Sequence, residues 1–314
     1  METKQLIQKL TGKAMLSIAD NTFAVINGHV HITDLVSFIR LYEYDMAIFQ
    51  DGVYNLLNLN TGDDFLDFPV FNDNVDSPFI GQFIGKTDDL LILKEFIKFV
   101  GKDVLRPAMT GIHFHSMGYL EATNGHILKR FKHEPHEHGF IISTNAAKKI
   151  IALCEFYKNT DFAISFDGKN IRIQTNKFSF VTSCIDDKFP HCESVIPVMC
   201  DVEIDLNIDW KLLKEMRKNA KKTGYKVGVT FDIDNNCLKY FTIDKYNDTV
   251  NYIYLSEITK RNVMHGYDKD NAKLCMPFYS QQIEGIKFLA EYLLPFEGCS
   301  TIQLIDNTRP ACFC

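Results

Sequence analysis

The sequence lacks a long apolar run, and this absence argues against a helix that spans a membrane. No stretch approaches the roughly 18 consecutive apolar residues that such a helix needs. The first ten residues, METKQLIQKL, are polar and amphipathic, and they contain no apolar core of a secretory signal. We therefore expect a protein that acts in the cytoplasm without a membrane partner.

The motifs of several enzyme classes are missing as well. The chain has no Gly-rich phosphate loop and no Gly-x-Ser-x-Gly nucleophile elbow. Its nine cysteines form no Cys-x-x-Cys pair, and a hydrophobic content of 46% is enough for an ordinary core. We expect reduced thiols, no cofactor, no bound metal and no catalytic residue.

An excess of positive charge is also lacking, because the net charge is −6. A surface of this kind does not bind nucleic acid indiscriminately. Cations are nevertheless concentrated in one predicted helix, from Ile208 to Lys222. Apolar side chains recur there every four residues, and lysines line the opposite face with Glu215 as the one acidic residue after the helix start. A local positive face for phosphates is one reading, and a solvated helix face is the plain alternative.

The predicted elements recur in a fixed order along the chain. A helix, a strand, an Asp-Gly turn, a second strand and a Phe-Pro pair follow one another in 33–69 and again in 144–190. The third stretch, 208–314, repeats this order without the Phe-Pro pair. We predict helices over Thr33–Tyr42 and Ser280–Tyr292 from their apolar spacing. Repeats longer than 100 residues indicate duplicated domains, which we place at 1–76, 77–198 and 199–314.

The most distinctive stretch runs from Leu105 to Leu128. Ile112 and Phe114 alternate with two histidines, which is the period of a half-buried strand. Met117-Gly118 supplies a turn into a return strand, and Asn124-Gly125 supplies residues that tolerate positive φ for a second reversal. The pattern predicts a hairpin followed by a second sharp corner.

The amino-acid sequence of this hairpin resembles that of the second domain of bacterial DNA polymerase III beta sliding clamps. Arg106-Pro107 precedes it, and its corner reads Ala122-Thr123-Asn124-Gly125-His126-Ile127-Leu128, where the family has a Thr-Asp-Gly-His-Arg-Leu-like turn. Asn124 thus stands for the family's Asp, and Ile127 for its Arg. The resemblance continues in 142–197, which contains Asp186-Asp187-Lys188-Phe189-Pro190 and Val195-Ile196-Pro197, and in 31–69 and 274–314.

The resemblance implies an α+β fold of repeated DNA-clamp (processivity fold) domains, each with helices packed on antiparallel sheets, in a ring-forming protein. It further implies a non-catalytic processivity factor that encircles double-stranded DNA without reading its sequence. Its partners would be a replicative DNA polymerase, a clamp loader and a second copy of the chain in a homodimer ring.

Two departures from the family pattern leave an alternative open. Residues 1–30 leave room for one helix and a brief hairpin only, and the chain ends in the strand-like Ala311–Cys314 in place of an apolar Met-Pro-x-x-Leu-like tail. A clamp-derived interaction protein that does not close a ring is therefore the second hypothesis.

The resemblance also implies two sets of functional residues. The cations expected to face DNA from the helices are Lys94, Lys98, Lys148, Lys149, Lys211, Lys214, Arg217, Lys218, Lys221 and Lys222. The positions that align with the family's partner-peptide pocket are Met109, Thr123, Gly125, His126, Ile127, Leu128, Pro190, Val195, Phe278, Gln282 and Thr308. Ordinary core packing is the plain alternative for each residue of the second set.

The histidines support a hypothesis from another class. His113 and His115 share one predicted strand face, and His133, His136 and His138 crowd one loop beside two glutamates. Imidazole and carboxylate groups are good zinc ligands, so a metal-dependent hydrolase is the third hypothesis. The spacing follows no ligand rule, and a solvated loop is the simpler interpretation.

Overall fold

The computed structural model describes residues 3–12, 23–26, 29–34, 36–42, 83–135, 138–244, 250–266, 268–278, 285–304 and 309–314. The chain divides into two compact units. Unit 1 comprises Met1–Gly118 and Glu134–Phe189, and unit 2 comprises Tyr119–His133 and Pro190–Cys314. These units do not decide the three-domain division 1–76, 77–198 and 199–314, which stays a prediction.

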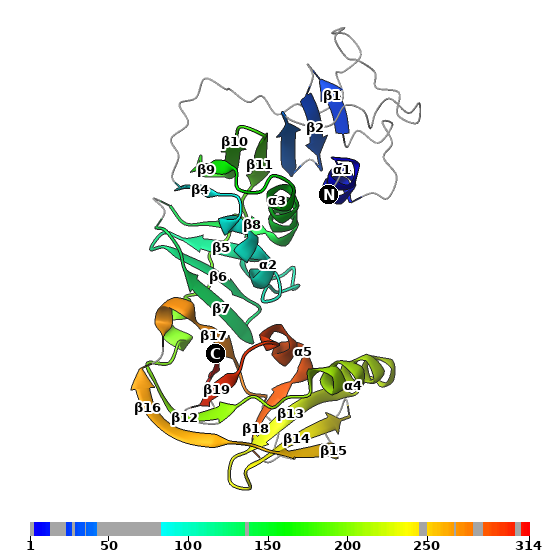
Figure 1. Ribbon diagram of the computed structural model, residues 1–314, viewed down its shortest axis with the longest axis vertical. Helices are drawn as coiled ribbons and strands as arrows, with labels where there is room; N and C mark the ends of the chain where they lie inside the picture. Colours follow the sequence, from blue (N-terminus) through cyan, green and yellow to red (C-terminus); the bar gives the residue numbers. More distant parts are fainter. Residues whose placement is uncertain are drawn as a thin grey trace. The chain divides into compact units, whose positions relative to one another are not determined.

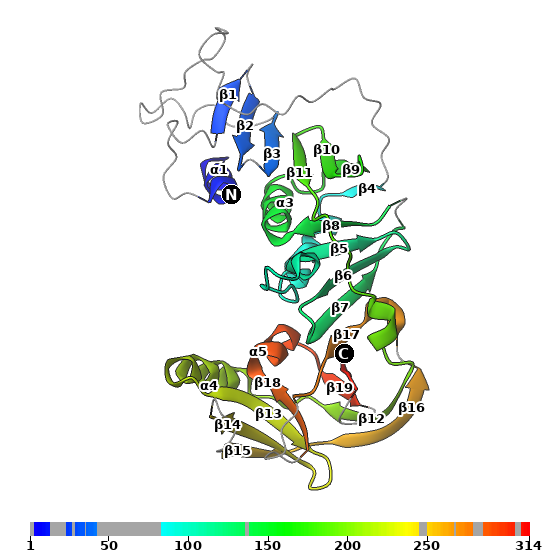
Figure 2. The same ribbon diagram turned by 180° about the vertical axis from the view of Figure 1, so that it is seen from behind.

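Unit 1 contains an antiparallel seven-stranded sheet with strand order β1-β2-β3-β11-β10-β9-β4 (Figures 1 and 2). Its strands are β1 (Phe23–Ile26), β2 (His29–Thr33), β3 (Ser37–Leu41), β4 (Phe83–Lys86), β9 (Asp161–Phe166), β10 (Asn170–Thr175) and β11 (Phe178–Ser183). A second pair in this unit joins β5 (Gly111–His115) to β8 (Phe140–Ser143). Most of these strands agree with the predicted hairpins, including the Asp167-Gly168 turn between β9 and β10, where Gly168 has a φ of +93°.

The helices of unit 1 are α1 (Thr3–Thr11), α2 (Leu93–Phe96) and α3 (Thr144–Phe156), with 3₁₀ turns η3 (Asp89–Ile92) and η4 (Pro107–Thr110). α3 begins where the sequence predicts, because the Ser143 hydroxyl accepts a hydrogen bond from the Ala146 N–H. Its apolar side chains are buried, and α1 packs beside it (Figure 1).

The predicted helix over Thr33–Tyr42 is wrong, because this segment contains β3. Ser37, Ile39 and Leu41 are buried in alternation, and β3 pairs with both β2 and β11. Asp34 accepts hydrogen bonds from the N–H groups of Val36 and Ser37, as an N-cap would, but here it closes a turn into a strand. Cross-strand partners therefore decide the structure of this segment.

Unit 2 contains two antiparallel sheets. One has the order β16-β12-β19-β20-β17-β7-β6, and the other has the order β15-β14-β13-β18. The strands are β6 (Tyr119–Thr123), β7 (Ile127–Lys132), β12 (Met199–Asp205), β13 (Lys226–Asp232), β14 (Cys237–Ile243), β15 (Val250–Glu257), β16 (Lys260–Gly266), β17 (Lys273–Cys275), β18 (Ile286–Leu289), β19 (Thr301–Leu304) and β20 (Ala311–Phe313). The helical elements are α4 (Trp210–Thr223), α5 (Ala290–Leu293), η5 (Cys192–Val195), η6 (Lys269–Asn271) and η7 (Leu294–Phe296). α4 and α5 both pack against β13 (Figure 1).

The predicted helix over Ser280–Tyr292 is wrong over its described part, because Ile286–Leu289 forms β18 and α5 begins only at Ala290. β18 approaches β13 closely, and a glycine on β13 and another immediately before β18 permit this. A Cβ atom at Gly228 would lie 2.2 Å from the Phe288 carbonyl oxygen, and one at Gly285 would lie 2.5 Å from the Phe231 carbonyl oxygen. Strand pairing with β13 overrides the local spacing.

Several elements predicted within 33–69 lie outside the described residues, among them the two strands joined by Asp51-Gly52 and the Phe-Pro pair at 68–69. The nine cysteines all lie in the described part, and no disulfide joins any of them. Among the residues that the structure describes, no helix is long and apolar enough to cross a membrane.

Candidate functional site

The cation-rich helix α4 is held at both ends by specific caps. The Asp209 carboxylate accepts a hydrogen bond from the Leu212 N–H at 2.9 Å, and Gly224 ends the helix with a φ of +76°. Leu213, Met216 and Ala220 are its buried side chains. The predicted apolar stripe has a four-residue spacing from Ile208 through Leu212, Met216 and Ala220. Met216 and Ala220 are buried as predicted, whereas Leu213 is buried in place of Leu212 and Ile208 precedes the helix.

The opposite face of α4 is strongly positive. Lys211, Lys214, Lys218, Lys221 and Lys222 are exposed, and Arg217 is half-buried. The Lys214 ammonium lies 2.6 Å from the Glu297 carboxylate, so part of its charge is compensated by unit 2 itself. α4 therefore carries six cations and one acidic residue over its 14 residues, as the sequence predicts.

The cations predicted on unit 1 differ from one another in availability. Lys98 and Lys148 are exposed. The Lys94 ammonium lies 2.9 Å from one Glu155 oxygen, and the Lys9 ammonium lies 3.0 Å from the other. These two lysines hold the pKa of Glu155 below its ordinary value.

Lys149 does not fit the predicted DNA-facing role. Its side chain is 6% exposed and forms an ion pair with Asp34. The Lys149 hydrogen bond and the N–H groups of Ser37 and Val36 together lower the pKa of Asp34 against the opposing effect of its burial. Lys149 therefore ties α3 to the turn before β3, a role set by a carboxylate 115 residues away in the sequence.

The predicted corner at 123–127 in unit 2 is closed by side-chain hydrogen bonds. The Asn124 side-chain oxygen accepts from the N–H groups of His126 and Ile127, both at 2.9 Å. The Thr123 hydroxyl donates to the Ile127 carbonyl at 2.7 Å and accepts from the Gly125 N–H at 3.1 Å. Gly125 has a φ of +88°, so glycine is favoured there.

The corner is also fixed from the side of β17. The Met276 N–H donates to the His126 carbonyl at 2.8 Å, and Cys275 pairs with Ile127 in the sheet. The His126 ring stacks on Tyr292 with a centroid separation of 4.3 Å. This places Gly125 and His126 on a rigid, exposed corner.

The predicted pocket residues divide into surface and core. Within unit 2, Gly125, His126 and Val195 are exposed, Pro190 and Phe278 are half-buried, and Thr123, Ile127 and Leu128 are buried. Met109 lies in η4 of unit 1 and is half-buried. Gln282 and Thr308 lie outside the described residues. The exposed members are those that a partner could touch, while the buried members shape the corner from beneath.

A cluster of charged side chains that was not predicted lies on β6 and β7, the two strands that the corner joins. Arg130 on β7 is 4% exposed, and its guanidinium donates to the Glu121 carboxylate of β6 at 2.9 and 2.6 Å. It also donates to Glu193 of η5 and lies 4.6 Å from the centroid of the Tyr119 ring. Glu121 and Arg130 are direct cross-strand partners, so the hairpin register could have revealed their pairing.

The histidines do not assemble a metal site among the described residues. There, no group of three His, Cys, Asp or Glu side chains is placed to hold an ion, and His136 lies outside that part of the chain. His113 stacks on Phe189 at 4.6 Å, and the His115 Nδ1 atom accepts the Met117 N–H at 3.0 Å. The metal-dependent hydrolase hypothesis therefore gains no support from the described residues.

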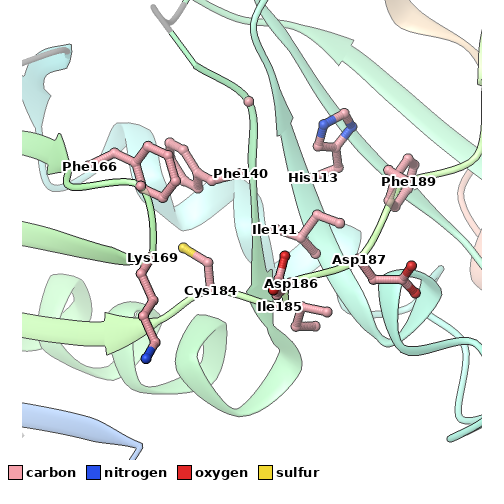
Figure 3. Close-up of a pocket in the computed structure, with 12 residues that line it drawn as sticks. His113, Phe140, Ile141, Phe166, Lys169, Cys184, Ile185, Asp186, Asp187 and Phe189 are labelled. Atoms are coloured by element: carbon pink, nitrogen blue, oxygen red, sulfur yellow. The ribbon is translucent and has the colours of Figure 1, made fainter.

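A cavity of about 600 Å³ opens in unit 1 near His113 (Figure 3). Phe140 and Phe166 stack on one side of it, and His113 and Phe189 stack on the other. Asp187 borders the cavity, but its carboxylate accepts the N–H groups of Ala108 and Lys188. Asp187 is therefore used as a local capping group for two backbone N–H groups.

Comparisons with known proteins identify the fold. No family model matches the chain, and no curated protein matches it. Solved structures do match over nearly the whole chain. A DNA polymerase III beta chain from Streptococcus pneumoniae has a TM-score of 0.64 at 14% identity, covering 100% of this chain and 94% of its own.

Two further structures agree with this match. The DnaN sliding clamp of Bartonella birtlesii bound to griselimycin has a TM-score of 0.63 at 16% identity and covers 99% of this chain and 93% of its own. The Helicobacter pylori beta clamp bound to a DNA ligase peptide has a TM-score of 0.58 at 14% identity, and the match covers 98% of this chain and 92% of the clamp chain. The chain therefore has the α+β sliding-clamp fold that the hairpin resemblance implied.

Proposed function

We propose that this chain is a divergent DNA sliding clamp, a non-catalytic processivity factor that encircles duplex DNA and tethers a replicative polymerase in the cytoplasm. The observation that carries the proposal is the exposed cationic face of α4 in a protein of net charge −6 with this fold. Phosphate contacts from lysines carry no sequence information, which suits a protein that moves along DNA. The tether raises the effective concentration of the polymerase at the primer end.

We propose that the exposed corner at 123–127 and Val195 of η5 receive partner peptides. The support comes from the rigid corner described above and from two neighbours of the same fold that are bound to a DNA ligase peptide and to griselimycin. A short apolar peptide gains affinity from a surface that is already ordered, because little conformational entropy is then lost on binding.

The α4 assignment is tested by charge reversal. The triple variant Lys218→Glu, Lys221→Glu and Lys222→Glu reverses the far end of the cationic face and leaves the buried Met216 and Ala220 in place. We expect it to lose the ability to lengthen the products that the host replicative polymerase makes on a singly primed template.

A matched control removes the same positive charge elsewhere. Lys158, Lys169 and Lys188 are exposed residues of unit 1 outside the predicted set, and their change to Glu alters the net charge equally. The control is expected to keep full stimulation. Full stimulation by the α4 variant, or equal loss in both variants, would remove α4 from the DNA-facing role.

A further inference from the structure

Arg130 lies on β7, the strand that follows the corner at 123–127, and it binds Glu193 of η5, the short turn that also carries Val195. We propose that this ion pair is the positioning element of the partner site: Arg130 holds Glu193, and Glu193 holds η5 so that Val195 and the residues after it stay exposed for an apolar partner peptide. The proposal rests on the proposed function and adds to it a named pair that sets the shape of the site.

Arg130 is fixed independently of Glu193. Two of its N–H groups are bound by the Glu121 carboxylate, which is itself buried, and its Cζ lies over the Tyr119 ring. The Arg130 N–H of the backbone donates to the Ala272 carbonyl at 2.7 Å. Glu121 holds the guanidinium at Nε and at one terminal nitrogen, and the other terminal nitrogen donates to Glu193.

Glu193 provides the connection to η5. Its side chain is 48% exposed, in contrast to the buried Arg130, so the pair lies at the edge of the core. The hydrogen bond from Arg130 is the main cause of its lowered pKa, and the Lys269 ammonium lies 3.8 Å from its second oxygen. A charge-assisted bond to a group that cannot move fixes the position of the shorter, more exposed partner.

The segment needs such an anchor because its own backbone supplies little order. η5 is a single 3₁₀ turn of four residues, and helices of this kind are not stable alone. Val195, Val198 and Met199 are 45%, 65% and 47% exposed, which leaves three apolar side chains in contact with water over five residues. Cys192 and Ile196 are buried and hold the segment to unit 2, while Glu193 fixes its orientation between them.

Asp270, which Lys132 binds in the same network, provides a matched control. The Asp270 carboxylate accepts from Lys132 at 2.8 Å and from the Tyr119 hydroxyl at 3.1 Å, but it lies on η6 and makes none of the described contacts with η5. The variant Asp270→Asn therefore removes a charge from the network without removing the link to η5. Arg130 is left unchanged in the experiment, because its loss would leave Glu121 as a buried, unpaired charge.

The experiment compares Glu193→Ala, Glu193→Gln and Asp270→Asn with the unchanged protein by amide hydrogen exchange and by calorimetric titration with griselimycin. For Glu193→Ala we expect amide exchange in residues 192–199 to rise about tenfold, and griselimycin affinity to fall about tenfold, the effect of losing one charge-assisted bond. Glu193→Gln keeps a hydrogen-bond acceptor, so we expect it to retain part of the amide protection and part of the griselimycin affinity. Asp270→Asn is expected to change neither.

Unchanged exchange at 192–199 in Glu193→Ala, or an equal rise in Asp270→Asn, would overturn the positioning role. An unchanged protein that binds no griselimycin would instead count against the proposed partner site, while the exchange measurement would still decide whether Glu193 positions η5. Exchange that rises across all of unit 2 would mean that the pair stabilises the unit as a whole, and that result would also overturn the proposal.

Discussion

Asn124 shows how one side chain determines the path of the chain at the exposed corner. Its oxygen accepts from two successive N–H groups, those of His126 and Ile127, and the course of the backbone into β7 depends on both bonds. Asparagine and aspartate share this acceptor geometry, so an aspartate at position 124 is expected to close the turn in the same way.

The variant Asn124→Ala is expected to lower the free energy of unfolding by about 1–2 kcal/mol, because two backbone donors lose their acceptor. Urea unfolding followed by circular dichroism measures this difference. Asn124→Asp retains the acceptor and is expected to stay within about 0.5 kcal/mol of the unchanged protein. A loss in the Asp variant as large as that in the Ala variant would show that the acceptor is not what stabilises the corner.

Asp232 links the stability of unit 2 to pH. The Lys239 ammonium at 2.6 Å and the Asn235 side chain at 2.8 Å bind its carboxylate and lower its pKa to about 2. A carboxyl whose pKa is lower in the folded state stabilises the fold above its unfolded pKa, and this contribution is lost as the pH falls toward the folded pKa.

We therefore expect the variant Asp232→Asn to be less stable than the unchanged protein at pH 7. The difference is expected to stay constant down to about pH 4 and to shrink between pH 4 and pH 2. Urea unfolding at a series of pH values measures it. A difference that does not change with pH over this interval would mean that the Asp232 charge is not the source of the stability.

At the scale of elements, periodicity predicts a helix or strand well where the segment makes its own contacts. α4 was predicted from its apolar spacing and its opposite row of lysines. The turn before β6 was predicted from Gly118 and the corner at 123–127 from Gly125, which have φ values of +83° and +88°. These features depend on residues within one turn or one hairpin, so the local sequence contains the necessary information.

Elements that depend on distant strands were predicted wrongly. The spacing of Leu35, Phe38, Ile39 and Tyr42 fits a helix, but β3 is selected by β11, whose residues lie more than 130 positions later in the chain. In the same way, the sequence predicts Lys149 as an exposed helix cation, because its ion pair with the distant Asp34 has no local signature. The link from Arg130 to Glu193 spans 63 residues and has no local signature.

At the scale of the whole molecule, the proposed ring requires a second copy of the chain. We expect light scattering to give a mass near twice 36.1 kDa at micromolar concentrations. A mass that stays at 36.1 kDa over the whole accessible concentration range would favour the interaction protein that closes no ring. Because the α4 charge reversal leaves the buried face intact, that variant is expected to have the same mass as the unchanged protein.

The central claim, that this protein encloses DNA, is tested most directly by comparing its retention on circular and linear DNA. The protein would be loaded onto a nicked circular plasmid with ATP and an extract of the cells that produce it, washed at high salt, and then exposed to a restriction enzyme that cuts the circle once. The account predicts retention on the intact circle and release after the cut, because a closed ring slides off a free end. Equal retention before and after the cut, or salt-sensitive binding to both forms, would contradict it.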